Sequence, residues 1–148
     1  MYTALLVTHS WLRWAVLILG IVALAGALKK HARKDLEPDK SSLGFLISAD
    51  LQLLVGIVLY VLSPYFALLT SSPGEAMGDA GIRYFALEHT VAMLVAIALA
   101  HVGRIVGKRS ASPNRYRTAA VLFALALVIM LAAIPWPFLS EARPLLRF

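Results

Sequence analysis

The chain of 148 residues is 60% hydrophobic and 15% charged, with a mean hydropathy of +0.78, whereas a soluble domain typically has about 45–50% apolar and 25% charged residues; this composition indicates an integral membrane protein. The net charge of +6 lies mainly in short loops between apolar runs, as membrane topology requires, so nucleic acid is not expected as a partner. Because the sequence contains no cysteine, disulfides, iron–sulfur clusters, thiolate zinc sites and cysteine nucleophiles are excluded, and histidine is the main candidate metal ligand.

Four apolar stretches approach the roughly 20 residues that a membrane-spanning helix needs. They predict helices over residues 3–29, 42–63, 83–107 and 117–135, and we interpret residues 1–148 as one domain. The first stretch lacks a basic leading segment and a clear cleavage site, so we expect it to be retained as a helix. The expected fold is all-α, an integral membrane up-down-up-down four-helix bundle in which residues 64–83 form an external loop.

Basic residues are distributed unevenly between the two ends of this bundle. Ten of them lie in or beside the loops after the first and third helices, and three lie at the other end: Arg83, Arg143 and Arg147. Because cytoplasmic loops are enriched in Lys and Arg, we expect both basic loops in the cytoplasm and both termini outside.

A histidine lies near the start of both the first and the third predicted helix, on a face of small residues. His9 and Arg13 are four residues apart and therefore share a face. The face of His9 continues through Gly20, Ala23 and Ala27. The face of His89 continues through Ala92, Ala96 and Gly103. Such stripes permit either close helix packing or the approach of a flat cofactor, and both interpretations stay open.

Other ionisable residues lie where a bilayer makes them costly, which marks each as a functional candidate. Arg83 and Glu88 lie at the mouth of the third helix, beside His89, whereas His101 lies near its far end. His31, in the first basic loop, is expected to have no functional role.

Asp50 is the acidic residue inside the second predicted helix. It lies on the order of 12 Å from the start of that helix at 1.5 Å per residue. A charged carboxylate is disfavoured there, so we expect Asp50 to be protonated or to pair with His101 or Arg104.

Four short runs are distributed over the four predicted helices: HSWLRW at 9–14, ISADLQLLVG at 47–56, RYFALEH at 83–89 and IPWP at 134–137. In their order and spacing they resemble a family of small four-helix bacterial membrane proteins commonly labelled cytochrome B. The resemblance extends over all four helices. It implies a haem b and a place in the bacterial cytoplasmic (inner) membrane.

The leading hypothesis is an electron-transfer protein of a membrane redox chain in which His9 and His89 hold haem b. If the helices alternate in direction, the first and third are parallel and diagonal, so the two imidazoles meet on the external side. The diagonal of about 14 Å has room for an iron between two axial histidines. We expect Arg13 or Arg83 to pair with a haem propionate and Glu88 to orient a histidine.

Two other hypotheses explain the same residues. In the first, the protein is a non-catalytic accessory subunit of a membrane complex, and Arg13 pairs with Glu88 inside the bundle without a cofactor. In the second, it is a quinone-binding protein or a small proton-coupled transporter with Asp50 and His101 as a proton path. The expected partners are the lipid bilayer and, depending on the hypothesis, respiratory membrane subunits or quinone. Because the sequence has no motif for hydrolysis, phosphate binding or nucleophilic catalysis, we expect an electron carrier or accessory subunit rather than a stand-alone enzyme.

Overall fold

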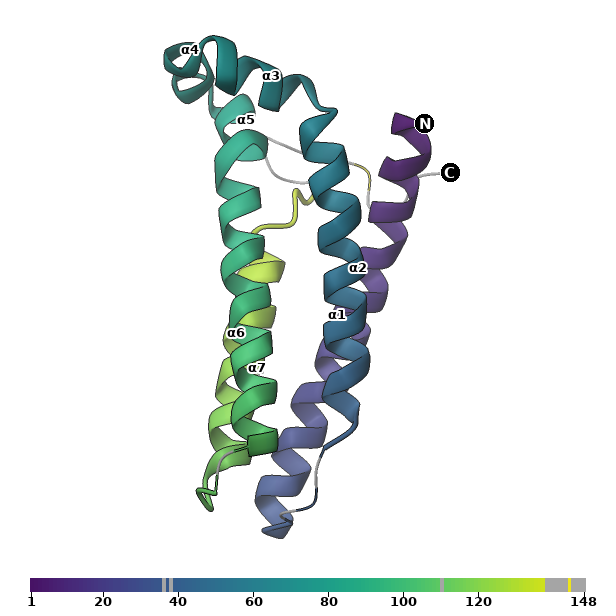
Figure 1. The fold of residues 1–148 in the computed structure, drawn as a ribbon, viewed down its shortest axis with the longest axis vertical. Helices are drawn as coiled ribbons and strands as arrows, with labels where there is room; N and C mark the ends of the chain where they lie inside the picture. The colour runs from purple at the N-terminus through teal and green to yellow at the C-terminus, as the bar shows by residue number, and fades with distance from the viewer. Residues whose placement is uncertain (36, 38, 110, 138–143, 145–148) are drawn as a thin grey trace.

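The computed structural model describes residues 1–35, 37, 39–109, 111–137 and 144, and all regular structure among them is helical. Four segments are long and apolar enough to cross a membrane: α1 (Tyr2–Arg33), α2 (Ser41–Val61), the continuous segment Ala80–Arg109, and α7 (Arg115–Ala132). Figure 1 shows them as an elongated bundle, which confirms the predicted all-α four-helix architecture. The segment Ala80–Arg109 comprises α5 (Ala80–Arg83), the π-helical turn η1 (Tyr84–Glu88) and α6 (His89–Arg109).

The first and last long helices end at different residues from those predicted. α1 continues past residue 29 because Lys, Ala and Arg in its last turn are good helix formers. It stops after Arg33, where Lys34 adopts a left-handed conformation with φ 53°. α7 ends at Ala132 rather than at 135, because Pro135 disfavours the helical conformation in Ile134 before it.

The connection between the second and third long helices consists of short helices, which corrects the prediction of a plain loop over residues 64–83. α2 ends at Val61 rather than at 63, and the Ser63 hydroxyl accepts from the Phe66 backbone N–H at 3.2 Å to cap α3 (Pro64–Ser71). α4 (Pro73–Gly78) follows. The Asp79 carboxylate then caps α5, so the third long helical segment begins at Ala80 rather than at 83.

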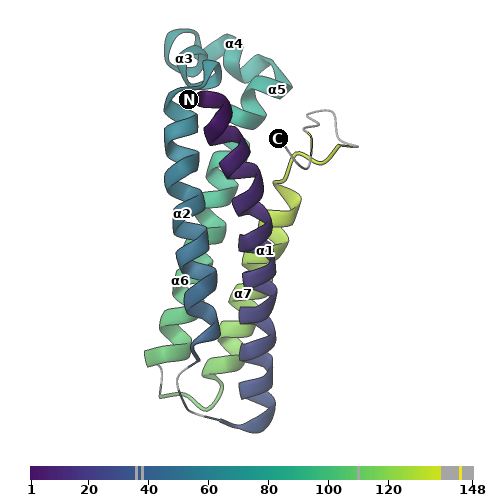
Figure 2. The same ribbon diagram turned by 90° about the vertical axis from the view of Figure 1, so that its right-hand side faces the viewer.

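The four long helices pack in a ring. α1 packs against α2 and α7, and α6 packs against α7 and α2 (Figures 1 and 2). α1 and α6 therefore lie diagonally across the bundle, as the up-and-down topology predicts. The small-residue faces point inward, and the buried residues on them are Gly20, Ala23 and Ala27 on α1 and Ala96 and Gly103 on α6.

Each long helix contributes one residue to a single layer of the core. The rings of Phe45 on α2 and Phe123 on α7 are fully buried and meet edge to face, with centroids 5.9 Å apart. Glycines on the other two helices make room for these rings. A Cβ atom added to Gly20 would lie 3.0 Å from Phe45, and one added to Gly103 would lie 2.8 Å from Phe123.

Large apolar side chains cover the outer surface of the bundle. Ile18, Leu54 and Val128, on three different helices, are each 60–61% exposed. Water would make such a surface unfavourable, whereas lipid chains solvate it well. Together with the four membrane-length helices, this surface makes the chain a multi-pass membrane protein in a lipid environment.

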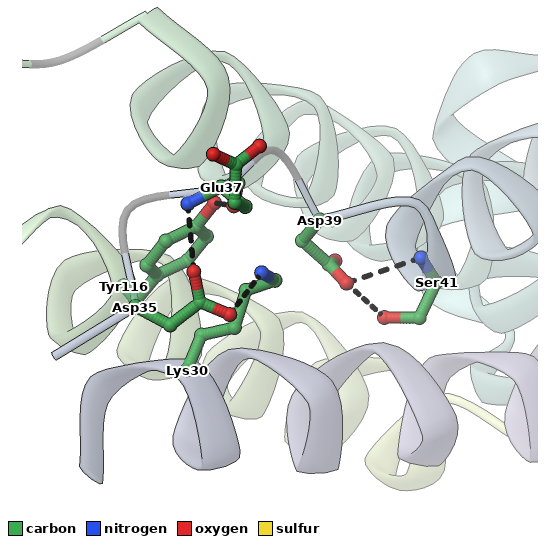
Figure 3. A network of polar contacts seen from close by, with 6 residues as sticks. All are labelled: Lys30, Asp35, Glu37, Asp39, Ser41 and Tyr116. Carbon is green, nitrogen blue, oxygen red and sulfur yellow. Dashed lines mark hydrogen bonds and ion pairs between the residues drawn. The ribbon is translucent and has the colours of Figure 1, made fainter. Parts of the chain in front are cut away.

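A polar network holds the connection between α1 and α2 at one end of the bundle (Figure 3). Lys30 donates to the Asp35 carboxylate at 2.7 Å, and the Glu37 backbone N–H donates to the same carboxylate at 2.8 Å. The Tyr116 hydroxyl of α7 donates to the Glu37 carbonyl and so ties the connection to the fourth long helix. The hydrogen bond from Lys30 holds the pKa of the Asp35 carboxyl below its usual value.

Candidate functional site

His9 on α1 and His89 on α6 face each other across the bundle. Their ring centroids are 6.5 Å apart, and the ring planes make an angle of 66°. Because α1 and α6 are diagonal, the two imidazoles approach across the bundle rather than along a packed helix–helix seam. The structure thus brings together the two histidines that the helical periodicity singled out.

The turn that precedes His89 is π-helical, and such turns are frequent at functional sites. Tyr60 of α2 donates its hydroxyl to the Ala86 carbonyl within this turn at 2.8 Å. The Nδ1 atom of His89 lies 2.8 Å from the Ala133 carbonyl oxygen at the end of α7. A carbonyl only accepts, so Nδ1 carries the proton and the Nε2 lone pair of His89 remains available to a ligand.

Two residues of α2 contact His9 and fix its position. The Gln52 side-chain amide donates to the His9 carbonyl at 3.0 Å, and a Cβ atom added to Gly56 would lie 3.3 Å from His9 Cε1. Gln52 and Gly56 are four residues apart and therefore share the face that contacts His9. The Nδ1 atom of His9 is buried, and it has no hydrogen-bond partner in the part of the chain that the structure describes. Buried polar atoms nearly always have a partner, so this orphaned nitrogen fits a site for a ligand.

The charged residues at this end pair differently from the prediction. Glu88 accepts from the Arg83 guanidinium at 2.7 Å, so the ion pair found here is not the expected one between Arg13 and Glu88. Arg83 and Glu88 are five residues apart, and a π-helical turn brings residues at this spacing onto the same face. The Arg13 guanidinium instead lies 5.5 Å from the centroid of the Trp14 ring and donates to Ser10 at 3.4 Å.

Glu88 does not orient a histidine in the structure. The Ala133 carbonyl makes the hydrogen bond to His89 that was expected from Glu88. Arg13 is four residues from His9 on the same helix, and Arg83 is on the turn that leads to His89. Both guanidinium groups therefore lie close to the histidine pair along the chain.

The donor set at the histidine pair fits a haem better than a bare metal ion. Among the described residues, no group of three or more His, Cys, Asp or Glu side chains is placed so that it could hold a metal ion. A zinc ion takes at least three protein ligands. Haem iron takes four nitrogens from its macrocycle and needs only two axial ligands from the protein, which is the number of facing imidazoles present here.

A second polar pair lies further along the bundle. His101 Nε2 of α6 lies 2.9 Å from Asp50 Oδ1 of α2, which confirms the prediction that Asp50 pairs with His101. Arg104, the other predicted partner, donates instead to the Ser42 hydroxyl at 2.8 Å. His31 lies in the last turn of α1, at the end of the bundle that is remote from His9.

Some contacts of the site were not predicted from the sequence. The hydroxyl of Tyr84 donates to the Ala133 carbonyl at 2.7 Å, beside the hydrogen bond from His89. The hydroxyl of a tyrosine in an apolar helix needs a hydrogen-bond partner. From the sequence, this need could have marked Tyr60 and Tyr84 as residues with polar contacts near the histidine pair. The spacing of Gln52 and Gly56 is a similar signal on α2. Neither signal identifies the carbonyl or ring that the residue contacts.

Searches of protein-family models, curated proteins and solved structures found no significant match to this chain, so a functional assignment depends on the geometry of its own residues.

Proposed function

We propose that the protein is a membrane-bound b-type cytochrome in which His9 and His89 would hold a haem iron, and that it transfers electrons in a membrane redox chain. The observation that supports this most directly is the separation of 6.5 Å between the two ring centroids. With a metal–nitrogen bond of about 2.0–2.1 Å and roughly 1 Å from each nitrogen to its ring centre, two imidazoles on one metal have centroids about 6 Å apart. The observed separation is close to this value.

The surrounding residues support the proposal because they fix the tautomer of His89 and the position of His9. The Ala133 carbonyl holds His89 in the tautomer that presents Nε2, as partners of metal-binding histidines commonly do. Gln52 and Gly56 position His9 from α2. When bound, the haem supplies a one-electron carrier whose iron alternates between the ferric and ferrous states.

Arg13 and Arg83 are the proposed partners of the anionic haem propionates. A guanidinium recognises a carboxylate through two parallel hydrogen bonds, which suits this role. Arg83 already pairs with Glu88, and that pair is 40–50% exposed. We propose that Glu88 acts in the cofactor site by holding Arg83 in place rather than by contacting a histidine.

The cellular setting belongs to the same proposal. The resemblance to small four-helix bacterial cytochrome B proteins, carried by the runs that contain His9 and His89, favours the bacterial cytoplasmic membrane. The N-terminus and α3–α5 lie at one end of the bundle, and the two basic connections lie at the other (Figure 1). The positive-inside rule then favours termini outside the cytoplasm. Other respiratory membrane subunits are the proposed electron-transfer partners.

The visible spectrum of the purified protein tests the proposal. The wild type is expected to give a low-spin b-type reduced-minus-oxidised spectrum. His9→Ala and His89→Ala should each abolish that signal, because removal of one axial ligand already breaks the site. The double substitution should therefore add little further loss, which is the non-additivity expected of residues that act as a unit.

His31→Ala is the matched control, since it removes an imidazole from the same helix as His9 without changing the pair. Its spectrum should equal that of the wild type. The proposal is wrong if wild-type protein from haem-replete cells is folded and monodisperse but has no b-type absorbance. It is equally wrong if both single variants retain the wild-type spectrum.

A further inference from the structure

The pair of Asp50 and His101 lies at mid-depth in the bundle and faces outward. Asp50 is nine residues from the first residue of α2, roughly 13 Å along the helix axis. The Asp50 side chain is 49% exposed and that of His101 is 42% exposed. These are titratable groups outside the histidine site, at the contact between α2 and α6.

The surface around this pair is apolar. Leu51, which follows Asp50, is 48% exposed, and Val102, which follows His101, is 46% exposed. In a membrane these side chains contact hydrocarbon, where half-exposed polar groups are costly unless something polar covers them. A molecule that reaches the pair must therefore come through the lipid phase and must carry its own polar group.

The pair has free hydrogen-bonding capacity. When Asp50 is ionised, its carboxylate only accepts, so in that state His101 donates from Nε2 to Asp50 across the 2.9 Å contact. His101 Nδ1 then carries a lone pair and makes no hydrogen bond among the described residues, and the second carboxylate oxygen of Asp50 is likewise an acceptor. An acidic residue behind an imidazole makes the opposite nitrogen a better proton acceptor. The site thus suits a ligand that donates from hydroxyl groups.

Polar groups continue from the pair toward the basic end of the bundle. Arg104, one turn beyond His101, donates to the buried hydroxyl of Ser42 at 2.8 Å. The Ser42 backbone N–H donates to Asp39, whose carboxylate also accepts from Ser41 (Figure 3). A cavity of about 10 Å³, the size of one water molecule, is lined by Asp39, Ser42 and Arg104. These groups form a second polar cluster on α2 and α6, between the pair and the basic end of the bundle.

We infer that the outward face at Asp50 and His101 binds a membrane-soluble quinol, whose hydroxyl donates to His101 Nδ1 while its ring lies on the neighbouring aliphatic surface. A quinol has the three required properties: it is soluble in lipid, it donates from hydroxyl groups, and its chemistry involves protons. A second copy of the chain on the same face is the alternative occupant that the measurements below separate from quinol. The inference goes beyond the haem proposal and does not depend on it.

Photolabelling of the full-length protein in lipid nanodiscs tests the inference. The probe is a short-chain azidoquinol, with an unlabelled short-chain quinol as competitor and peptide mapping as the readout. The label is expected on α2 and α6 near Asp50 and His101, and the competitor should remove it. Asp50→Asn and His101→Gln should each weaken binding about tenfold, the effect of losing one hydrogen bond to a charged or polar partner.

Asp35→Asn is the matched control, because it makes the same chemical change in the first connection, and it should bind the probe as the wild type does. The measurements are repeated on the His9→Ala/His89→Ala variant, which should still bind quinol. Loss of the haem signal and loss of quinol binding are thereby separated.

The inference is overturned if the wild type takes no label, or takes it on other helix faces. It is also overturned if both substitutions leave the affinity unchanged. Finally, if the wild type is a dimer through this face and Asp50→Asn is a monomer, the face belongs to a second copy and not to quinol.

Discussion

Gly56 determines how closely the His9 ring can approach α2. An added Cβ atom would lie 3.3 Å from His9 Cε1, which is tighter than an ordinary contact. Gln52, one turn earlier, holds the backbone of His9 through its carbonyl at 3.0 Å. The two residues therefore restrict both the helix position and the ring position of His9, as supporting residues of ligand sites do.

We expect Gly56→Ala to lower haem affinity about tenfold, the lower end of the effect of losing a residue that orients a metal ligand. The reason is that the methyl group displaces the His9 ring by a few tenths of an ångström. Haem titration of the apo protein measures this. Gly44→Ala on the same helix is the control, because its added Cβ atom would meet Leu19 at an ordinary 3.6 Å. Equal haem affinity in the two variants would contradict the role of Gly56.

Among the helical elements, the π-helical turn η1 and Gly103 of α6 determine how the third long helical segment packs against its neighbours. η1 aligns Arg83 with Glu88 and is tied to α2 by Tyr60. Further along, Gly103 lets α6 approach Phe123 of α7, whose ring is 1% exposed and packs against Phe45. The rigid ring cannot move aside without disturbing the central layer.

Gly103→Ala should therefore destabilise the bundle by about 1–3 kcal/mol, the usual cost of overpacking a core. Alanine has the higher helix propensity, but that gain is only about 1 kcal/mol. Unfolding in denaturing detergent measures the difference. Gly107→Ala on the same helix is the control, since its added Cβ atom would lie 3.5 Å from Ala119 and Tyr116. A Gly103 variant as stable as the Gly107 variant would refute the packing argument.

At the scale of the whole molecule, the distribution of charge sets the orientation in the membrane. The described residues of the first and third connections (34, 35, 37, 39, 40 and 111–114) lie at one end of the bundle, and α3–α5 lie at the other (Figures 1 and 2). Basic residues flank both of the former connections: Lys29, Lys30, Arg33, Lys34, Lys40, Arg104, Lys108, Arg109, Arg115 and Arg117. Of the three basic residues expected at the opposite end, the structure describes Arg83, whereas Arg143 and Arg147 lie outside the described residues.

Reporter fusions should place residues 34–40 and 110–114 in the cytoplasm and residues 72–79 outside, because short cytoplasmic loops are enriched in Lys and Arg. A fluorescent protein that folds only in the cytoplasm and a phosphatase active only outside are the paired readouts. The opposite pattern at these connections would reverse the topology and would place the histidine pair at the cytoplasmic side.

Features that depend on short-range spacing can be predicted from the sequence alone. Hydrophobic length defines each span, because about 20 residues cross the hydrocarbon wherever they occur. Helical periodicity put His9 on the face of Gly20 and Ala23, and both small residues are buried. The pairing of Asp50 with His101 was also predictable, since an acidic group inside an apolar helix needs a partner and few are present.

Which atoms meet between helices depends on how the helices pack, and spacing along the chain does not specify this. Whether His89 bonds to the Ala133 carbonyl or to Glu88 depends on the rotation and axial shift of α6 against α7, and a hydrogen bond tolerates only a few tenths of an ångström in distance. Residue spacing within one helix does not specify either quantity. The π-helical turn before His89 shifts the register by a residue, which a regular period of 3.6 cannot predict. The distance of 6.5 Å between the two imidazoles is therefore a property of the packed bundle, set by the side chains of α2 and α7 that hold α1 and α6 apart.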